Sequence, residues 1–411
     1  MRRVAITGLG TINPCGIGVQ RTWDNLVAGH SGIATFTHFD VSAFSTRFGG
    51  YVSDFDPKAH LDPKDARRMS RFIQMAVVAA DEAVADAGLD IVNDPDAERI
   101  GVIVGSGVGG LEQMEIQYDI IREKGPDRVS PFLVPMMIID LAAGQISIRH
   151  GAKGLNYAPV SACATGTHAI GEAFEAIRAG RIVAAIAGGF DSGITSVALA
   201  GFCAARALST RNDDPVRASR PFDAGRDGFA MSEGGAAVVV EEWERAVQRG
   251  AHIYAEVLGY GATADAYHIT APAPDGSGAR RAMEMAIEQS GLDRSQVGYV
   301  NAHGTSTPAG DVAEAGAIRS VFGDTVPWVS STKSMTGHLL GGAGALESVV
   351  CAKAVETGVL PPTINLTDPD PAIDIPIVAN VAASVPIEAA MNNSFGFGGH
   401  NATLIFARAD R

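Results

Sequence analysis

One cysteine of the chain stands where a catalytic nucleophile is expected. Cys163 lies in Val-Ser-Ala-Cys-Ala-Thr-Gly at 160–166, between an expected strand over 156–160 and a helix expected to start near Thr165. A thiol at such a turn faces unpaired backbone N–H groups and the positive end of the helix dipole, and both favour the thiolate. The position therefore predicts a lowered pKa for Cys163 and N–H groups able to hold an oxyanion. Cysteine is also a common small core residue, which is how we interpret Cys351.

Two histidines follow in loops rich in glycine and threonine. His303 comes directly after the apolar residues 299–301, in Asn-Ala-His-Gly-Thr-Ser-Thr-Pro, and His338 precedes the glycine cluster at 341–344. Loops at strand ends often carry the function of a protein. A lone histidine is more often a structural hydrogen-bonding residue, but two in equivalent settings favour catalysis. Lys333, in the same loop as His338, would hold positive charge near a thiolate or a carboxylated substrate.

Composition and charge exclude several classes of function. The chain has 411 residues, of which 46% are apolar, so it can bury a large core. Its formal net charge of −14 argues against nucleic-acid binding. Its four cysteines are widely spaced and form no Cys-x-x-Cys pair, which argues against disulfides and zinc and indicates a reducing compartment. Strand character begins at Val4 and no run approaches roughly 18 apolar residues, so we expect a cytoplasmic protein with no membrane contact.

The elements that must position these residues alternate between strands and helices. We expect strands over 4–8, 100–104 and 182–187, the last being continuously apolar as in a strand covered on both faces. Helices are expected over 75–87 and over 167–179, the second ended by a glycine. This alternation is typical of α/β layering.

The chain also repeats its own pattern after roughly 200 residues. Residues 82–90 and 285–293 both read as a helix that ends in Gly-Leu-Asp, and each precedes a strand with a glycine-rich loop. A second pair aligns 160–163 with 329–333, which puts Lys333 at the position of Cys163. We therefore expect two similar α/β halves, 1–250 and 251–411, in one compact unit.

Several further segments are distinctive. Residues 105–110 match Gly-x-Gly-x-x-Gly, but no convincing acidic residue follows about 20 positions later, which argues against a dinucleotide site. Polar loops are expected over 206–226, where the chain would line an entrance, and over 361–371. The segment 392–401 brackets phenylalanine with glycine and is interpreted as a mobile gate.

A basic helical face is formed by Lys64, Arg67, Arg68 and Arg71. An ordinary solvated helix surface would also explain these residues.

Taken together, these motifs resemble the elongating β-ketoacyl carrier-protein synthases of the thiolase superfamily, most closely those of the synthase II type. The resemblance covers essentially the whole chain, from 4–10 to 393–399, and the order and spacing of its cysteine and histidine motifs are highly specific. It implies an α/β thiolase-like fold of two duplicated halves in five αβαβα layers. It also implies a homodimer.

The resemblance implies a decarboxylative Claisen condensation in two steps. Cys163 would take an acyl chain from acyl-carrier protein, and malonyl-carrier protein would then lose CO2 and attack the thioester. His303 and His338 resemble the pair that stabilises the malonyl thioester oxygen, and Lys333 matches the lysine that supports them. The backbone N–H groups of Cys163 and Phe395 would form the oxyanion hole, and Phe395 matches the gate residue.

Binding residues are also implied by the resemblance. The pantetheine arm and acyl chain would meet Thr270, Thr305, Thr307, Val108 and Phe202. Val108 stands where isoleucine is usual, which leaves the preferred chain length open. The acidic carrier protein would dock on Lys64, Arg67, Arg68, Arg128 and Arg206. No cofactor and no required metal are implied, although family members can hold a structural monovalent cation near residues that match Asn301, Ala302, Glu347 and Asn393.

Four alternative functions remain to be weighed. The ketosynthase subunit of a type II polyketide system has the same chemistry and stays open. A non-catalytic chain-length subunit would lack Cys163, and a degradative thiolase would need a second cysteine in a glycine-rich loop, where neither Cys203 nor Cys351 lies. A starter synthase that uses acyl-CoA resembles a Cys-His-Asn arrangement, whereas the third residue here is His338.

Overall fold

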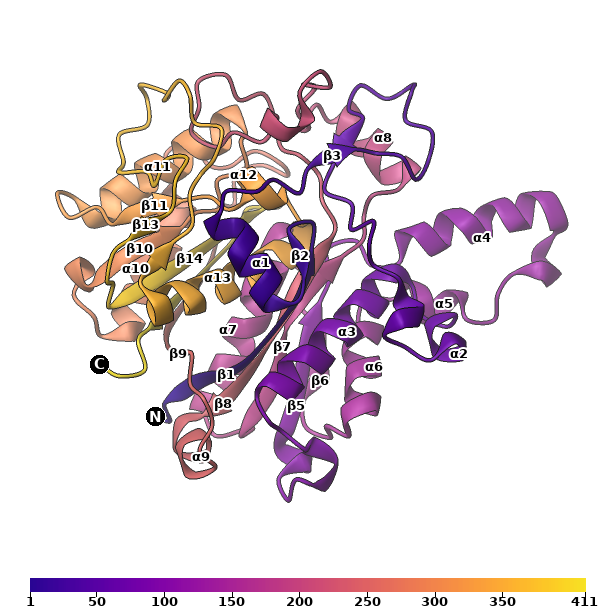
Figure 1. Ribbon diagram of the computed structural model, residues 1–411, viewed down its shortest axis with the longest axis horizontal. Coiled ribbons are helices and arrows are strands. Elements are labelled where there is room, and N and C mark those ends of the chain that lie inside the picture. The colour runs from indigo at the N-terminus through magenta and orange to yellow at the C-terminus, as the bar shows by residue number, and fades with distance from the viewer.

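Ten strands lie side by side in the main sheet of the computed structural model, which describes residues 1–411 (Figure 1). The first half of the chain supplies β1 Val4–Asn13, β5 Ile100–Gly105, β6 Asn156–Tyr157, β7 Ala184–Asp191 and β8 Gly234–Glu242. The second half supplies β9 Ala255–Ala264, β10 Val297–Asn301, β11 Trp328–Ser330, β14 Ala389–Gly396 and β15 His400–Ala407. The short β2, Gly16–Ile17, pairs with β1 beside this row.

The two halves have the same strand order, which confirms the duplication expected from the repeats. The first half runs β1-β8-β7-β5-β6 and the second runs β9-β15-β14-β10-β11. In each half the first two pairings are antiparallel and the last two are parallel. A short antiparallel ladder between β1 and β9 joins the halves into one sheet.

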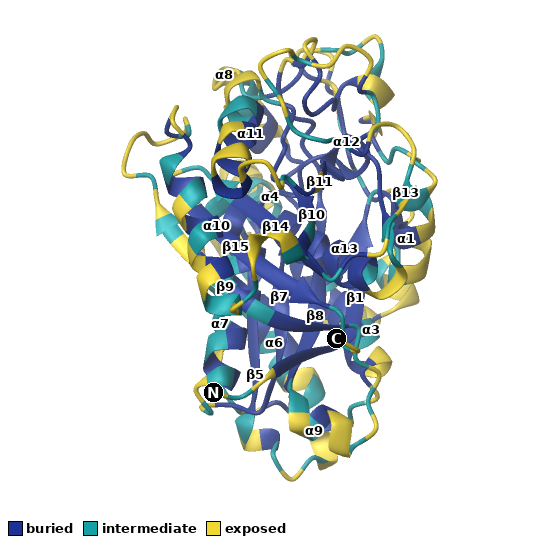
Figure 2. Cartoon of the chain, turned by 90° about the vertical axis from the view of Figure 1, so that its left-hand side faces the viewer, coloured by how far each residue is buried: buried dark blue, intermediate teal, exposed yellow.

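Helices complete five layers. Between the halves of the sheet, α7 Thr165–Arg178 and α13 Ala343–Thr357 pack against each other and against strands of both halves. The first half is covered on its outer face by α3 Arg71–Asp86 and α6 Leu141–His150, and the second by α10 Ser277–Ser290 and α11 Pro308–Phe322. Figure 2 shows that the strands are buried and that each outer helix has an exposed side and a buried side. The expected α/β fold of two duplicated halves is therefore confirmed.

The remaining elements are short or peripheral. α4 Leu111–Lys124 extends away from the body, and α5 Leu133–Met137 returns toward it (Figure 1). The others are α1 Val19–Val27, α2 Pro63–Ala66, α8 Ser196–Ala204, α9 Trp243–Gln248, α12 Lys333–Thr336, β3 Ala34–Thr35, β4 Phe48–Gly49, β12 Val359–Leu360 and β13 Ala383–Ser384. None of the helices has both the length and the apolar character that crossing a membrane requires.

Most of the expected elements are found, with shifted ends. The helices expected over 75–87 and 167–179 correspond to α3 and α7, and Gly180 after α7 has the expected positive φ of 73°. The strand expected over 156–160 is wrong in length, because only the two residues of β6 pair with β5. This strand is the last of the sheet, and Pro159 lacks the N–H that a longer ladder would need.

We predict that Gly166→Ala will destabilise the fold, because this glycine lies where α7 meets α13. A methyl group there would stand 2.7 Å from the backbone N of Ala345. Overpacking of this kind costs about 1–3 kcal/mol. A methyl group on Gly316 of α11 would instead meet open space. Gly316→Ala should therefore raise the free energy of unfolding by about 0.5–1 kcal/mol, because alanine favours the helix over glycine. Thermal unfolding of both variants checks this, and an equal or higher melting temperature for Gly166→Ala would contradict it.

Candidate active site

The turn that carries Cys163 is held by local hydrogen bonds. Cys163 lies in a single 3-10 turn over Ala162–Ala164, directly before α7. Ala162 has a φ of 50°, an unusual conformation for a residue with a side chain. The Thr165 hydroxyl donates to the Ala162 carbonyl at 2.8 Å and accepts from the N–H of Ser161 at 2.9 Å. Two side-chain hydrogen bonds of one threonine therefore fix the turn that carries Cys163 at the start of α7.

The predicted nucleophile and the two histidines come together. His303 follows β10 and His338 follows α12, so both lie in loops after a strand or short helix of the second half. Their rings lie 5.3 Å apart and nearly perpendicular. One ligand atom each of Cys163, His303 and His338 lies within 4.8 Å of the others, and all three residues are buried. The group is also a sulfur and nitrogen donor set of the kind that zinc accepts.

Lys333 lies behind the histidines. Its ammonium group forms an ion pair with Glu347 of α13, and both side chains are almost wholly buried, 1% and 2% exposed. Burial lowers the pKa of both His303 and His338 well below the ordinary value, and the charge of Lys333 lowers it further. Both imidazoles are therefore neutral at neutral pH and can each present an N–H donor.

The protonation state predicted for Cys163 is wrong. Burial raises the pKa of the thiol to about 11, although the N–H of Phe397 and the charge of Lys333 lower it in part. Asp191, a buried carboxylate, adds to the rise. The loss of hydration outweighs the two N–H bonds and the charge of the lysine, so the resting group is a thiol rather than a thiolate.

The oxyanion donor predicted at Phe395 stays a prediction, and the N–H of Phe397 offers a second candidate. Phe395 is the second-last residue of β14, and its ring lies 6.0 Å from that of His303. The backbone N–H groups that reach the thiol are those of Cys163 itself and of Phe397. The ring of Phe397 lies 6.5 Å from that of Phe202.

A cavity of about 530 Å³ opens beside these groups and gathers the predicted binding residues. Cys163, His303 and His338 lie in its wall, and the other predicted residues that line it are Val108, Phe202, Arg206, Thr270, Thr305, Thr307 and Phe395. The hydroxyls of Thr305 and Thr307 lie 3.0 Å apart. One connected space therefore links the thiol, apolar side chains and a hydroxyl pair.

The glycine motif at 105–110 is part of this wall. Gly107 and Val108 line the cavity, and their N–H groups donate to the carboxylate of Asp191 at 2.9 and 3.0 Å. Because a protein carboxylate already accepts these N–H groups, they are not free to hold a phosphate. The structure thus agrees with the interpretation that this motif is not a dinucleotide site.

Sequence reasoning did not identify two buried acids on α11. Glu314 accepts the N–H groups of His303 and Gly304 at 2.8 and 2.7 Å, and burial raises its pKa to about 7. Asp311 accepts the N–H groups of Ser306 and Phe222, and burial raises its pKa to about 6. Both hold the histidine loop. The sequence pattern that could have identified them is a pair of acids three residues apart, in a helical segment rich in small residues that directly follows the loop.

The basic residues divide into two groups. Lys64, Arg67, Arg68 and Arg128 are exposed, and Arg206 is exposed at the cavity. Arg71, which the helical spacing grouped with them, is instead half of a buried ion pair with Glu233 and also donates to the Val52 carbonyl. The expected basic face therefore excludes Arg71.

Two buried oxygens near the expected cation position have no partner. They are Oδ1 of Asn301 and Oε2 of Glu347. The side-chain oxygen of Asn393 already accepts from Thr403 at 2.9 Å. Oxygen atoms without donors are the ligands that a hard cation needs, so Asn301 and Glu347 fit such an ion.

Comparison with known proteins gives the chain its relatives. It matches the family models described as "Beta-ketoacyl synthase, N-terminal domain" over residues 1–246 and "Beta-ketoacyl synthase, C-terminal domain" over 254–367. It is 53% identical over 409 residues to "3-oxoacyl-[acyl-carrier-protein] synthase 2" of Staphylococcus aureus (strain N315), covering 99% of this chain and 98% of that one. The protein of the same name from Synechocystis sp. (strain ATCC 27184 / PCC 6803 / Kazusa) is 51% identical with the same coverage.

Solved structures give the same picture of the fold. A beta-ketoacyl synthase from Burkholderia phymatum STM815 superposes with a TM-score of 0.92 at 37% identity, covering 100% of both chains. A type II PKS acyl-carrier protein in complex with its ketosynthase bound to the hexaketide gives 0.91 at 33% identity, covering 99% of this chain and 100% of that one. The five-layered arrangement is therefore shared with ketosynthases of known structure.

We predict that alkylation of Cys163 will speed up with pH across about pH 6 to 10, with no plateau near neutrality. Burial raises the thiol pKa to about 11, and the thiolate fraction grows tenfold per pH unit below the pKa. Iodoacetamide labelling followed by mass spectrometry measures the rate. The experiment uses a Cys203→Ser background, since Cys203 is the one cysteine of the chain that is not buried and would compete for the reagent. A plateau below about pH 8 would mean that the thiol is activated at rest.

Proposed function

The chain belongs to the beta-ketoacyl synthase family, and on this premise we propose how its residues divide the work of the reaction. The protein is an acyltransferase that elongates fatty acyl chains by decarboxylative condensation, as its relatives' names indicate. The observation that carries the proposed roles is a buried thiol within 4.8 Å of two neutral imidazoles, at the wall of one cavity.

In the first step, Cys163 attacks the thioester carbonyl of an acyl-carrier protein. The S–H bond breaks, a bond forms between Sγ and the acyl carbon, and the carrier thiol leaves with the proton. The N–H groups of Cys163 and Phe397 converge on the sulfur, so the negative oxygen of the intermediate would lie between them. Because the thiol is neutral at rest, it must lose its proton during the attack itself.

In the second step, the malonyl thioester loses CO2 and its electron pair passes to the thioester oxygen as an enolate. His303 and His338 donate N–H hydrogen bonds to that oxygen, where negative charge develops. Their lowered pKa keeps them neutral. A charged imidazolium would bind the carboxylate of the malonyl group before it reacts, and binding of that kind does not speed up the loss of CO2. The enolate carbon then attacks the acyl group, and the thiolate of Cys163 leaves and regains a proton.

The cavity residues divide between the two ends of the substrate. Val108 and Phe202 are proposed to contact the acyl chain, and Thr270, Thr305 and Thr307 to hydrogen-bond the pantetheine arm. Phe395 and Phe397 both line the cavity, and the gate role is proposed for Phe397 because it alone of the two stands between two glycines, Gly396 and Gly398. Glycine on both sides allows the backbone rotation that a gate needs.

A monovalent cation would be held by Asn301 and Glu347, whose unpartnered oxygens fit it. Bound there, it would supply positive charge beside the Lys333 ion pair and fix the orientation of Glu347. No step of the reaction passes through this ion. Asn393 contributes less than the resemblance implied, since its side-chain oxygen is already used.

A homodimer is supported by uncovered apolar surface. Large apolar side chains are exposed along α4, α5 and the loop between them: Met114, Ile116, Tyr118, Ile121, Phe132 and Val134. Patches of this size commonly mark protein interfaces. β6 lies at the end of the sheet with one side unpaired, which a second copy would cover.

The carrier protein is the other proposed partner. Lys64, Arg67, Arg68, Arg128 and Arg206 are exposed, and one of them lies at the cavity. The chain as a whole is acidic, with a formal net charge of −14, so these cations would be the attractive surface for an acidic partner. The polyketide alternative is weaker, because relatives named 3-oxoacyl synthase 2 are 53% identical and the polyketide neighbour 33%.

We predict that wild type will form an acyl adduct with a long-chain acyl-carrier protein and discharge it as a β-ketoacyl product when malonyl-carrier protein is added. Cys163→Ala should form no adduct. His303→Ala and His338→Ala should keep the adduct but lose elongation by roughly 100-fold or more, because each removes an enolate donor. Intact-protein mass spectrometry follows both steps. An adduct on Cys163→Ala would reject the nucleophile, and no adduct on wild type would reject the synthase function of the chain on its own.

We predict that reversing the charge of Arg67 and Arg68 to Glu will raise KM for the acyl-carrier protein by about tenfold at low salt. Reaction with a small acyl thioester should be unchanged, because no carrier protein is involved. Arg21→Glu is the control, since Arg21 is an exposed arginine on α1 outside the proposed surface. Equal KM values for the double variant and wild type would remove this surface from the docking site.

A further inference from the structure

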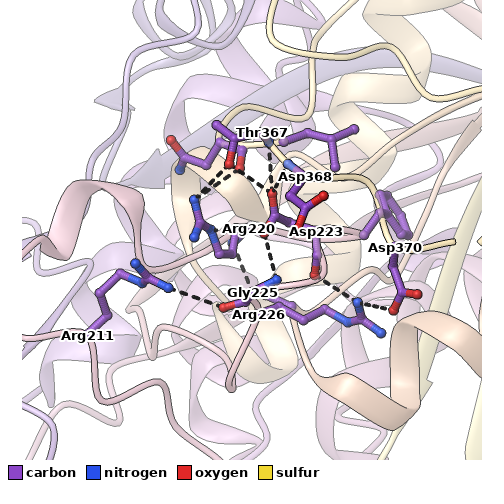
Figure 3. Close-up of polar contacts among 12 residues, drawn as sticks. Arg211, Arg220, Asp223, Gly225, Arg226, Thr367, Asp368 and Asp370 are labelled. Carbon is purple, nitrogen blue, oxygen red and sulfur yellow. Dashed lines mark hydrogen bonds and ion pairs between the residues drawn. The ribbon is translucent and has the colours of Figure 1, made fainter.

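The polar loops expected over 206–226 and 361–371 are joined in the structure by a dense set of charged contacts (Figure 3). Asp223 of the first loop bonds the backbone of the second. Its Oδ2 accepts the N–H groups of Thr367 and Asp368, each at 2.8 Å, and its Oδ1 accepts the N–H of Gly225 at 2.8 Å. The proposed reaction uses neither loop directly, so their tight connection needs another explanation.

Arg226 extends this network toward the cavity. Its Nη1 donates to Asp370 at 2.7 Å and to the Asp223 carbonyl at 2.8 Å. Its Nη2 donates to the Pro308 carbonyl at 2.8 Å and its Nε to the Thr307 carbonyl at 3.2 Å. The side chain is only 3% exposed. One rigid guanidinium group thus ties the outer loops to the start of α11.

The segment that Arg226 contacts is a strained turn. Gly304 and Ser306 have φ values of 31° and 69°, and the hydroxyls of Thr305 and Thr307 project from the same turn into the cavity wall. Ser306 is also held from the 220–228 segment, since its Oγ accepts the N–H of Arg220 at 3.0 Å and its carbonyl accepts that of Gly228 at 3.1 Å. A non-glycine residue keeps such a φ only when its surroundings enforce it.

The two ends of this loop are held by different groups. Glu314 holds the N–H groups of His303 and Gly304, whereas Arg226 holds the carbonyls of Thr307 and Pro308. Removing Arg226 would therefore loosen the threonine end and leave the histidine end attached. The chemistry and the binding of the substrate arm can be affected separately.

We propose that Arg226 is a positioning residue for the pantetheine arm, acting through the backbone of Thr307 and Pro308. The inference rests on the proposed function, in which the Thr305 and Thr307 hydroxyls bind that arm. It predicts a defect in KM for thioester substrates that carry pantetheine, with the chemical step largely kept. A network that only stabilised the fold would instead affect stability and show no such selectivity.

Two neighbouring arginines supply matched controls. Arg220 belongs to the same network and is 10% exposed, but its side chain makes only long contacts: to Thr367 at 3.4 Å, to the Asn365 carbonyl at 3.5 Å and to the Asp223 carboxylate at 3.7 Å. Arg211 donates to the Gly225 carbonyl at 3.2 Å from a more exposed position. Neither guanidinium contacts the turn that carries the threonines.

The test compares wild type, Arg226→Gln, Arg226→Lys, Arg220→Gln and Arg211→Gln in steady-state elongation with malonyl-carrier protein. For Arg226→Gln we expect KM to rise about tenfold and kcat to stay within about twofold. Arg226→Lys should fall between, because lysine keeps the charge but not the forked geometry. Both control variants should stay within about twofold of wild-type KM. Alkylation of Cys163 by iodoacetamide, which carries no pantetheine, should be unchanged throughout.

Other outcomes would overturn the proposal. If wild type is active and Arg226→Gln has the same KM, Arg226 has no positioning role and the proposed function stays intact. Equal KM defects in Arg226→Gln and Arg220→Gln would also overturn that role, in favour of a merely structural network. If Arg226→Gln does not fold, Arg226→Lys and Asp370→Asn, which removes only the outer anchor, must raise KM above Arg220→Gln. Absence of wild-type turnover would overturn the proposed function itself.

Discussion

The close contact between α7 and α13 is the constraint on which the site depends. Each half of the duplicated sheet supplies one of these helices to the shared middle layer, and the segment before each carries functional groups: Cys163 before α7, and Lys333 and His338 before α13. Their approach leaves no room for a side chain at the contact, since a methyl group on Gly166 of α7 would lie 2.7 Å from the backbone N of Ala345 on α13. The duplication thus brings together groups that lie far apart in the sequence.

Burial then decides the protonation of everything that meets there. Lys333 lies beside two imidazoles and a carboxylate in a space almost without solvent, and hydration is the largest single contribution lost by each neighbour. The result is two neutral histidines and a neutral thiol at rest. A site of this kind holds little net charge until a substrate develops it, which is the condition under which fixed N–H donors act most strongly.

The sequence was sufficient for what depends on residue type and order. A cysteine at a strand-to-helix turn and two histidines in equivalent loops predict a shared site. The internal repeat predicts the duplicated sheet, because the spacing of similar segments can be read directly from a sequence. It was insufficient where a single N–H direction or the balance of two opposing energies decides. The N–H that reaches the thiol belongs to Phe397, two residues beyond the predicted donor Phe395, and the pKa of Cys163 rises because burial outweighs the N–H bond of Phe397 and the charge of Lys333. Arg71 shows the same limit, since helical spacing cannot reveal the buried Glu233 that pairs with it.

The arrangement of charged residues around the histidine loop separates two requirements that compete in an enzyme of this kind. The reacting end must be dry, and there the loop is held by Glu314, a carboxylate with a pKa raised by burial. At the other end of the loop Arg226 bonds carbonyls while Asp370, 19% exposed, anchors it toward the surface. The carbonyls of Thr307 and Pro308 need a donor, which a guanidinium supplies, whereas the N–H groups of His303 and Gly304 need an acceptor, which a carboxylate supplies. The choice of a cation at one end and an acid at the other therefore follows from which backbone groups face each end.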